Sequence, residues 1–78
     1  YYDELVDYAS ENYSFEVRQA AFSYLDAIGL FNDEALESLW RSTKHFNWRF
    51  KSFSRDLLSR LSDDIRYREK IIMLKSNN

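Results

Sequence analysis

Proline is absent from this chain, cysteine is absent, and glycine occurs once, at Gly29. Because sheets and hairpins need turn residues every few positions, this composition favours helices joined by short connections. At 78 residues the chain is one domain at most. A chain this short buries only roughly 60–65% of its unfolded surface, so its core is thin. No disulfide can reinforce it, and 14 aromatic residues supply buried area instead.

The sequence also excludes several classes of function. No apolar run approaches the ~18 residues of a membrane span, and no secretory leader pattern is present. A single histidine cannot form an H-E-x-x-H zinc site, and glycine-rich phosphate motifs are absent. The chain begins at Tyr1 and Tyr2 without a methionine, so we expect a piece of a larger protein. Alone it is expected to carry no catalytic residue and no metal ligands, and not to be an enzyme.

Apolar residues recur at steps of three and four along the chain, which is the pattern of amphipathic helices. The first helix is expected over roughly residues 2–11. The later helices are expected to begin at these capping residues: Ser14, Asn32 or Asp33, Asn47, and Ser62 or Asp63. Gly29 suits a left-handed cap at the end of the second helix. The last helix is expected to run through Ile65, Ile72 and Leu74.

A repeat is visible at an offset of 31 residues. It pairs identical residues as follows: Phe15 with Phe46, Arg18 with Arg49, Phe22 with Phe53, Ser23 with Ser54, and Leu30 with Leu61. We therefore expect repeats over about residues 1–31 and 32–62 and a last helix over about 63–75. Such helix pairs build α-solenoids. The predicted fold is all-α, a short HEAT/armadillo-like superhelix of about five antiparallel helices.

The small net charge of −2 hides an asymmetry along the chain. Residues 1–37 hold nine acids and one base, a net charge of −8, whereas residues 38–78 hold ten bases and four acids, a net charge of +6. Such a dipole can steer an anionic ligand toward the second half. Alternatively, the charges set only helix register and solubility.

The sequence after His45 is the richest in candidate binding residues. With Asn47 as N-cap, Arg49 and Lys51 fall in the first turn of a helix, where free N–H groups and the dipole already favour anions. Cations are disfavoured at that end unless an anion is bound there. Arg49 and Lys51 are two residues apart, so they reach one anion only if the turn is irregular or the ligand lies over the helix end. Otherwise they are solvated, or Arg49 pairs with an acid of the preceding repeat.

The stretch Arg49-Phe50-Lys51 resembles the R-x-K stretch in the C-terminal helical domain of M1-family zinc aminopeptidases of the leukotriene A4 hydrolase and aminopeptidase B type. The resemblance extends upstream to Glu16-Val17-Arg18, which is similar to the E-M-R helix of that domain, and downstream to Asp63-Asp64-Ile65-Arg66-Tyr67. It covers most of residues 15–75, and the two arginine landmarks lie a few residues further apart here.

The resemblance implies a function for the chain. In that family the R-x-K pair binds the C-terminal carboxylate of the peptide substrate, a role that carries over to Arg49 and Lys51. The chain would be a non-catalytic C-terminal domain that shapes the substrate cleft. Zinc and its ligands would lie in the catalytic domain of the parent protein. The expected partners are that domain and a peptide substrate, in the cytoplasm or the periplasm.

Two other functions follow from the residues themselves. A HEAT-like module could bind a partner helix or an acidic segment over the basic half. Aromatic residues also alternate with bases between Trp40 and Arg55, as in some single-strand nucleic-acid sites. Helical spacing turns most of these rings toward the core, so nucleic acid is the least favoured partner. No membrane partner is expected. His45 is interpreted as structural, and Trp48 as the most exposed of these aromatics.

Overall fold

The computed structural model describes residues 2–76. Within this range the chain forms five α-helices and no strand, which confirms the predicted all-α class. The helices are α1 (Tyr2–Tyr8), α2 (Phe15–Ile28), α3 (Asp33–Ser42), α4 (Trp48–Ser62) and α5 (Arg68–Ser76). Their connections are short, as expected for a chain without proline.

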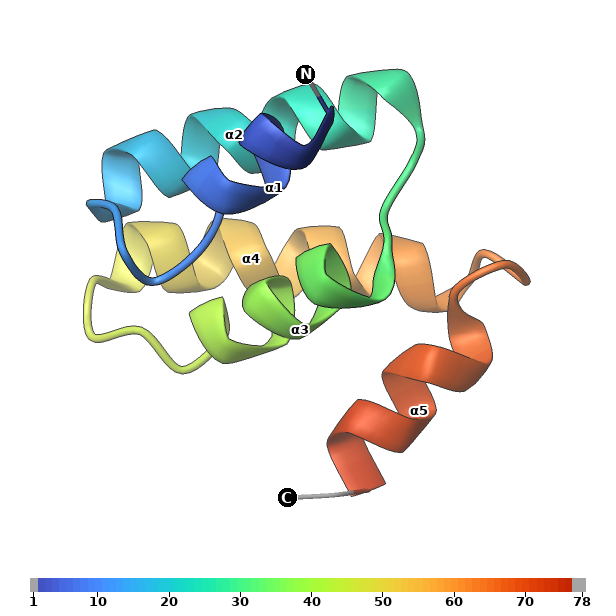
Figure 1. Cartoon of the computed structure of the whole chain (residues 1–78). Coiled ribbons are helices and arrows are strands. Elements are labelled where there is room, and N and C mark those ends of the chain that lie inside the picture. Colours follow the sequence, from blue (N-terminus) through green and yellow to red (C-terminus); the bar gives the residue numbers. More distant parts are fainter. Residues whose placement is uncertain (1, 77–78) are drawn as a thin grey trace.

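The helices form two hairpins and a final helix. α1 packs against α2, α3 packs against α4, and the hairpins meet where α2 lies beside α4. Figure 1 shows that the two helices of each hairpin run in opposite directions. α5 packs against α3 and α4 at the far end of the stack. One stacking step does not define a superhelix, so the HEAT-like superhelix stays a prediction.

Gly29 ends α2 in the way that its sequence position predicts. Its φ is 69°, in the left-handed region, and its N–H donates to the carbonyls of Leu25 and Asp26. The N–H of Leu30 then donates back to Leu25, which closes the helix end. A Cβ at Gly29 would meet no atom within 4 Å, so backbone conformation alone requires glycine here.

Tyrosine hydroxyls from both ends of the chain fix the connection between α2 and α3. The Tyr67 hydroxyl donates to the Gly29 carbonyl and accepts from the Phe31 N–H, each at 3.1 Å. The Tyr2 hydroxyl donates to the Leu30 carbonyl at 3.1 Å and accepts from the backbone N–H of Asn32, the N-cap of α3, at 2.8 Å. These bonds satisfy backbone groups of the connection and so orient the second hairpin against the first.

The core consists of apolar side chains from all five helices and the connections between them. Its centre is a stacked pair, Phe22 and Phe50, whose ring centroids lie 6.3 Å apart. Other large side chains that are fully buried are Leu25, Leu36, Leu39, Leu57 and Ile71. Burial of each such side chain stabilises the fold by roughly 1.5–3 kcal/mol.

One arginine is buried inside this core. Arg18 is only 5% exposed, and its Nε donates to the Ala9 carbonyl at 3.1 Å. Its Nη2 donates to Ser42 Oγ at 2.7 Å and to the Ser38 carbonyl at 3.5 Å. Its Cζ lies 5.1 Å from the centroid of the Phe50 ring. Burial lowers the pKa of the guanidinium, yet the hydrogen bonds and the aromatic ring hold its charge inside.

The last helix begins later than predicted. Neither Ser62 nor Asp63 caps it, because Ser62 is the final residue of α4 and Asp63 is its C-cap. A turn over residues 63–67 follows, in which Asp64 Oδ1 accepts from the Arg66 N–H at 2.9 Å. The carboxylate also pairs with the Arg66 guanidinium at 2.8 Å. These hydrogen bonds hold the pKa of Asp64 below its usual range and stabilise a turn in place of a helix start.

The buried residues of this segment differ from the prediction as well. Ile65 lies in the turn and is 84% exposed, and Ile72 is exposed on α5. Ile71 is buried instead. Ile65 is exposed because it lies outside α5, and the way α5 packs against α3 and α4 buries Ile71 rather than Ile72. The first helix, predicted to reach residue 11, ends at Tyr8.

The residues paired by the 31-residue offset lie in unlike environments. Arg18 is buried and Arg49 exposed, whereas Ser54 is buried and Ser23 exposed. The N-cap residues of α2 and α4 are 33 positions apart. The offset that matches identical residues is therefore not the offset that matches α2 with α4.

Substitution of Arg18 by lysine is expected to lower the free energy of unfolding by about 1–3 kcal/mol, because an ammonium cannot make the same forked contacts to two helices. Urea denaturation measures this change. The matched control is Arg60→Lys, which alters an exposed pair with Asp26. It should change the free energy of unfolding by less than about 0.5 kcal/mol. Equal losses in the two variants would contradict the structural role of Arg18.

Substitution of Tyr67 by phenylalanine should lower the free energy of unfolding by about 1–2 kcal/mol, since it leaves the buried Phe31 N–H without its acceptor. Thermal and urea denaturation provide the measurement. Tyr24→Phe removes the same hydroxyl from a side chain that is 60% exposed and should be nearly neutral. A neutral Tyr67→Phe would show that the hydroxyl does not hold the connection.

Candidate functional site

The start of α4 matches its prediction. Asn47 is the N-cap, and its Oδ1 accepts from the backbone N–H groups of Arg49 and Phe50, each at 3.1 Å. These amides are among the donors that an anion at a helix N-terminus would use. Because the Asn47 side chain already occupies them, the charged side chains nearby must provide most of the attraction for a ligand.

Arg49 and Lys51 lie on different parts of the surface. Arg49 is exposed, and its Cζ lies 5.8 Å from the centroid of the Trp48 ring. Lys51 lines a hollow of about 440 Å³ together with Trp48, Ser52, Arg55 and Asp56, and Arg49 does not line it. α4 is helical from its first residue, so the expected divergence of side chains two apart applies. The structure groups Lys51 with Arg55, one helical turn later.

His45 contributes to the α3–α4 connection, as interpreted from the sequence. Its Nδ1 accepts from the Asn47 N–H at 3.0 Å. Its ring lies 4.4 Å from that of Phe46 and 5.2 Å from that of Phe50, measured between centroids. Trp48 is exposed as predicted, but Phe46 is more exposed still, at 91% against 71%.

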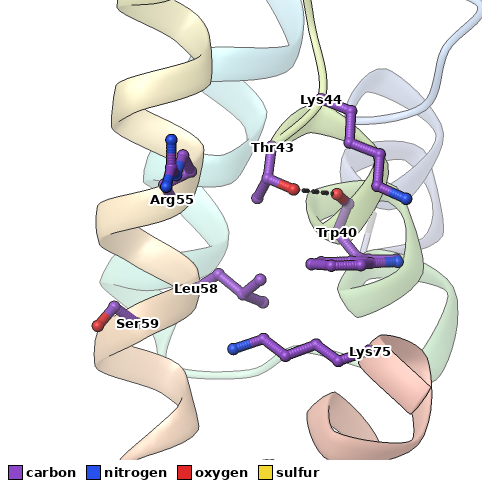
Figure 2. A pocket seen from close by; sticks show the side chains of 7 residues that line it. All are labelled: Trp40, Thr43, Lys44, Arg55, Leu58, Ser59 and Lys75. Atoms are coloured by element: carbon purple, nitrogen blue, oxygen red, sulfur yellow. Dashed lines mark hydrogen bonds between the residues drawn. The ribbon is translucent and has the colours of Figure 1, made fainter. Parts of the chain in front are cut away.

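A second hollow, of about 330 Å³, lies between α3, α4 and α5 (Figure 2). We call it the basic groove; it is lined by Trp40, Thr43, Lys44, Arg55, Leu58, Ser59 and Lys75. Lys44 follows α3, and its Nζ lies 4.7 Å from the centroid of the Trp40 ring. In Figure 2 the Lys75 side chain extends from α5 toward Leu58 on α4. Three cations from three segments thus line the groove together with Trp40 and Leu58.

Among residues 2–76, no acid lines the basic groove, and the cations around the groove have no carboxylate partner. Ion pairs among residues 2–76 engage other bases: Arg41 with Glu11 and Glu37, Arg60 with Asp26, and Arg66 with Asp64. Lys44, Arg55 and Lys75 make no ion pair within that part of the chain. The charge asymmetry of the sequence is therefore concentrated at this groove, which can attract an anion.

The sequence identified part of this site. The alternation of aromatic residues and bases between Trp40 and Arg55 included Lys44, but Lys75 was not singled out. The four-residue spacing of Lys51 and Arg55 is a signal that places two cations on one helix face. Lys75 could not be found this way, since its position depends on how α5 packs against α4.

Residues 2–76 contain no group of three histidine, cysteine or acidic side chains able to hold a metal ion. None of the helices described combines the length and the apolar character needed to cross a bilayer.

Comparison with protein-family models, with curated proteins and with solved structures gave no match to this chain.

Proposed function

We propose that the chain is a helical binding module that holds an acidic peptide segment in the basic groove. The observation that carries this proposal is that Lys44, Arg55 and Lys75 line one hollow and that none of them pairs with an acid of residues 2–76. A segment with two or three carboxylates would neutralise these cations. An apolar residue of the segment would pack on Trp40 and Leu58.

The surroundings of the groove favour a peptide over a nucleic acid. One face of Trp40 is already covered by Lys44, and Arg49 lies over Trp48. Base stacking needs free aromatic faces. The −8 charge of residues 1–37 would also repel a long polyanion, but much less a short acidic segment. Arginine and lysine bind carboxylates through charge-assisted hydrogen bonds, which suits a contact of moderate strength.

Binding of a capped ten-residue peptide, rich in aspartate and glutamate around one phenylalanine, tests the proposal by calorimetry. Neutralisation by Lys44→Gln, Arg55→Gln or Lys75→Gln should weaken binding by up to about fivefold each, as expected for exposed ion pairs. The triple variant should weaken it by at least about tenfold. The matched control is Lys70→Gln, on α5 but outside the groove, which should leave the affinity unchanged.

Three outcomes would contradict the acidic-peptide proposal. One is equal affinity for the same peptide with asparagine and glutamine in place of its acids. Another is an equal loss in Lys70→Gln. The third is tighter binding of a ten-nucleotide oligothymidine than of the acidic peptide, with a steep dependence on salt, which would assign the groove to single-stranded nucleic acid.

The second candidate function is the one implied by the resemblance: the C-terminal domain of a zinc aminopeptidase, within a HEAT-like superhelix. Its support is the Asn47 cap, which puts Arg49 and Lys51 in the first turn of α4, the position that the resemblance requires. The ligand would then lie over the helix end, with Arg49 on one side and Lys51 on the other. Zinc would be held by the parent's catalytic domain.

A terminal carboxylate distinguishes this function from the first. A peptide without acidic side chains and with a free C-terminus should bind the chain, and its C-terminal amide should bind at least about tenfold more weakly, owing to the lost charge-assisted bonds. Arg49→Gln and Lys51→Gln should remove the difference in affinity between the acid and the amide, and Lys44→Gln should leave that difference unchanged. Equal affinity for the acid and the amide would refute carboxylate recognition by Arg49 and Lys51.

A further inference from the structure

An apolar hollow of about 320 Å³ lies between α1 and α2, away from the basic groove. We call it the tyrosine hollow, and it is lined only by apolar and aromatic residues: Leu5, Tyr8, Val17, Ala20, Ala21 and Tyr24. Three of these, Tyr8, Val17 and Tyr24, are exposed. Pockets that hold small ligands start at roughly 300 Å³, so there is space for an aromatic side chain. Uncovered apolar surface of this kind marks interaction sites.

The connection between α3 and α4 has the opposite shape. Phe46 and Trp48 project into solvent, flanked by Lys44 and Arg49. We call residues 44–49 the aromatic tip. Aromatic side chains with arginine beside them are typical of the centre of protein interfaces.

The charges of these two surfaces are complementary. Residues 1–17, which contribute α1 and the start of α2, contain five acids and no base. Residues 38–55, which contain the aromatic tip, hold five bases and no acid. Arg41 already pairs with Glu11 within the chain, which leaves four bases in one range and four acids in the other for contacts between copies. The only base of α2, Arg18, is buried in the core. An apolar hollow on an acidic surface and an aromatic projection on a basic one fit each other in both packing and charge.

We propose that the aromatic tip of one chain inserts into the tyrosine hollow of a second copy, with Phe46 as the inserted side chain. The ring of Phe15, at the start of α2, lies 5.8 Å from that of His45 in the tip. The base of the tip is therefore beside the end of α2 that carries Val17. Because both surfaces belong to one chain, two copies can exchange tip and hollow reciprocally about a two-fold axis.

Sedimentation equilibrium over a range of concentrations tests the dimer. The mass of the unaltered chain should rise from that of one chain, 9.5 kDa, toward that of two, and added salt should weaken the association. Phe46→Ser or Tyr24→Ser should raise the dissociation constant by about tenfold or more, since each removes one side of the contact. Ile65→Ser and Ile72→Ser remove equally exposed apolar side chains elsewhere and should have no effect.

A mixture of the two variants gives the sharpest outcome. Phe46→Ser retains its hollow and Tyr24→Ser retains its tip, so a mixed pair has one intact contact that neither variant has with itself. The mixture should associate more tightly than either variant alone. A wild-type chain that stays monomeric at all concentrations, an equal effect of Ile65→Ser or Ile72→Ser, or a mixture no tighter than its components would overturn the proposal. Neither variant alters the basic groove, so the affinity of the groove for the acidic peptide tests the proposed function independently of the dimer.

Discussion

The buried guanidinium of Arg18 is the interaction on which the two-hairpin arrangement depends. From α2 it reaches the residue that follows α1, the last turn of α3 and the Phe50 ring of α4. A chain with so thin a core has little apolar area with which to fix the angle between its hairpins. Hydrogen bonds in fixed directions supply that angle. Burial of a cation is costly unless its donors find acceptors, and here backbone carbonyls and a serine hydroxyl accept from Nε and Nη2 of Arg18.

The bases of this chain thus fall into separate groups. Arg18 acts within the core. On the surface, Arg41 and Arg60 pair with acids of other segments, and Arg66 pairs with Asp64 in its own turn. The bases around the basic groove have no carboxylate partner within residues 2–76. A net charge near zero conceals this division, because the acids that balance the groove cations lie in the first half of the chain. The groove can therefore attract anions although the protein is weakly acidic overall.

Local signals predicted the parts of this structure that depend on local chemistry. Gly29 and Asn47 end and begin their helices as expected, because a left-handed backbone and an N-cap bond involve only neighbouring residues. The predicted start of α5 was wrong because the Asp64–Arg66 pair stabilises a turn that helical periodicity does not reveal. The burial of Arg18 and the presence of Lys75 and Arg55 around one hollow depend on tertiary packing, which no spacing in the sequence encodes.

The most direct test of this division of cations is an NMR measurement of arginine Nε–H exchange, made with and without the acidic peptide. We expect a slowly exchanging Arg18 Nε–H, protected by its bond to the Ala9 carbonyl and unchanged by the peptide. We expect fast exchange at Arg55 and a shift of the Arg55 signal when the peptide binds. An Arg18 signal that exchanges as fast as that of Arg55, or that alone responds to the peptide, would contradict this division of cations.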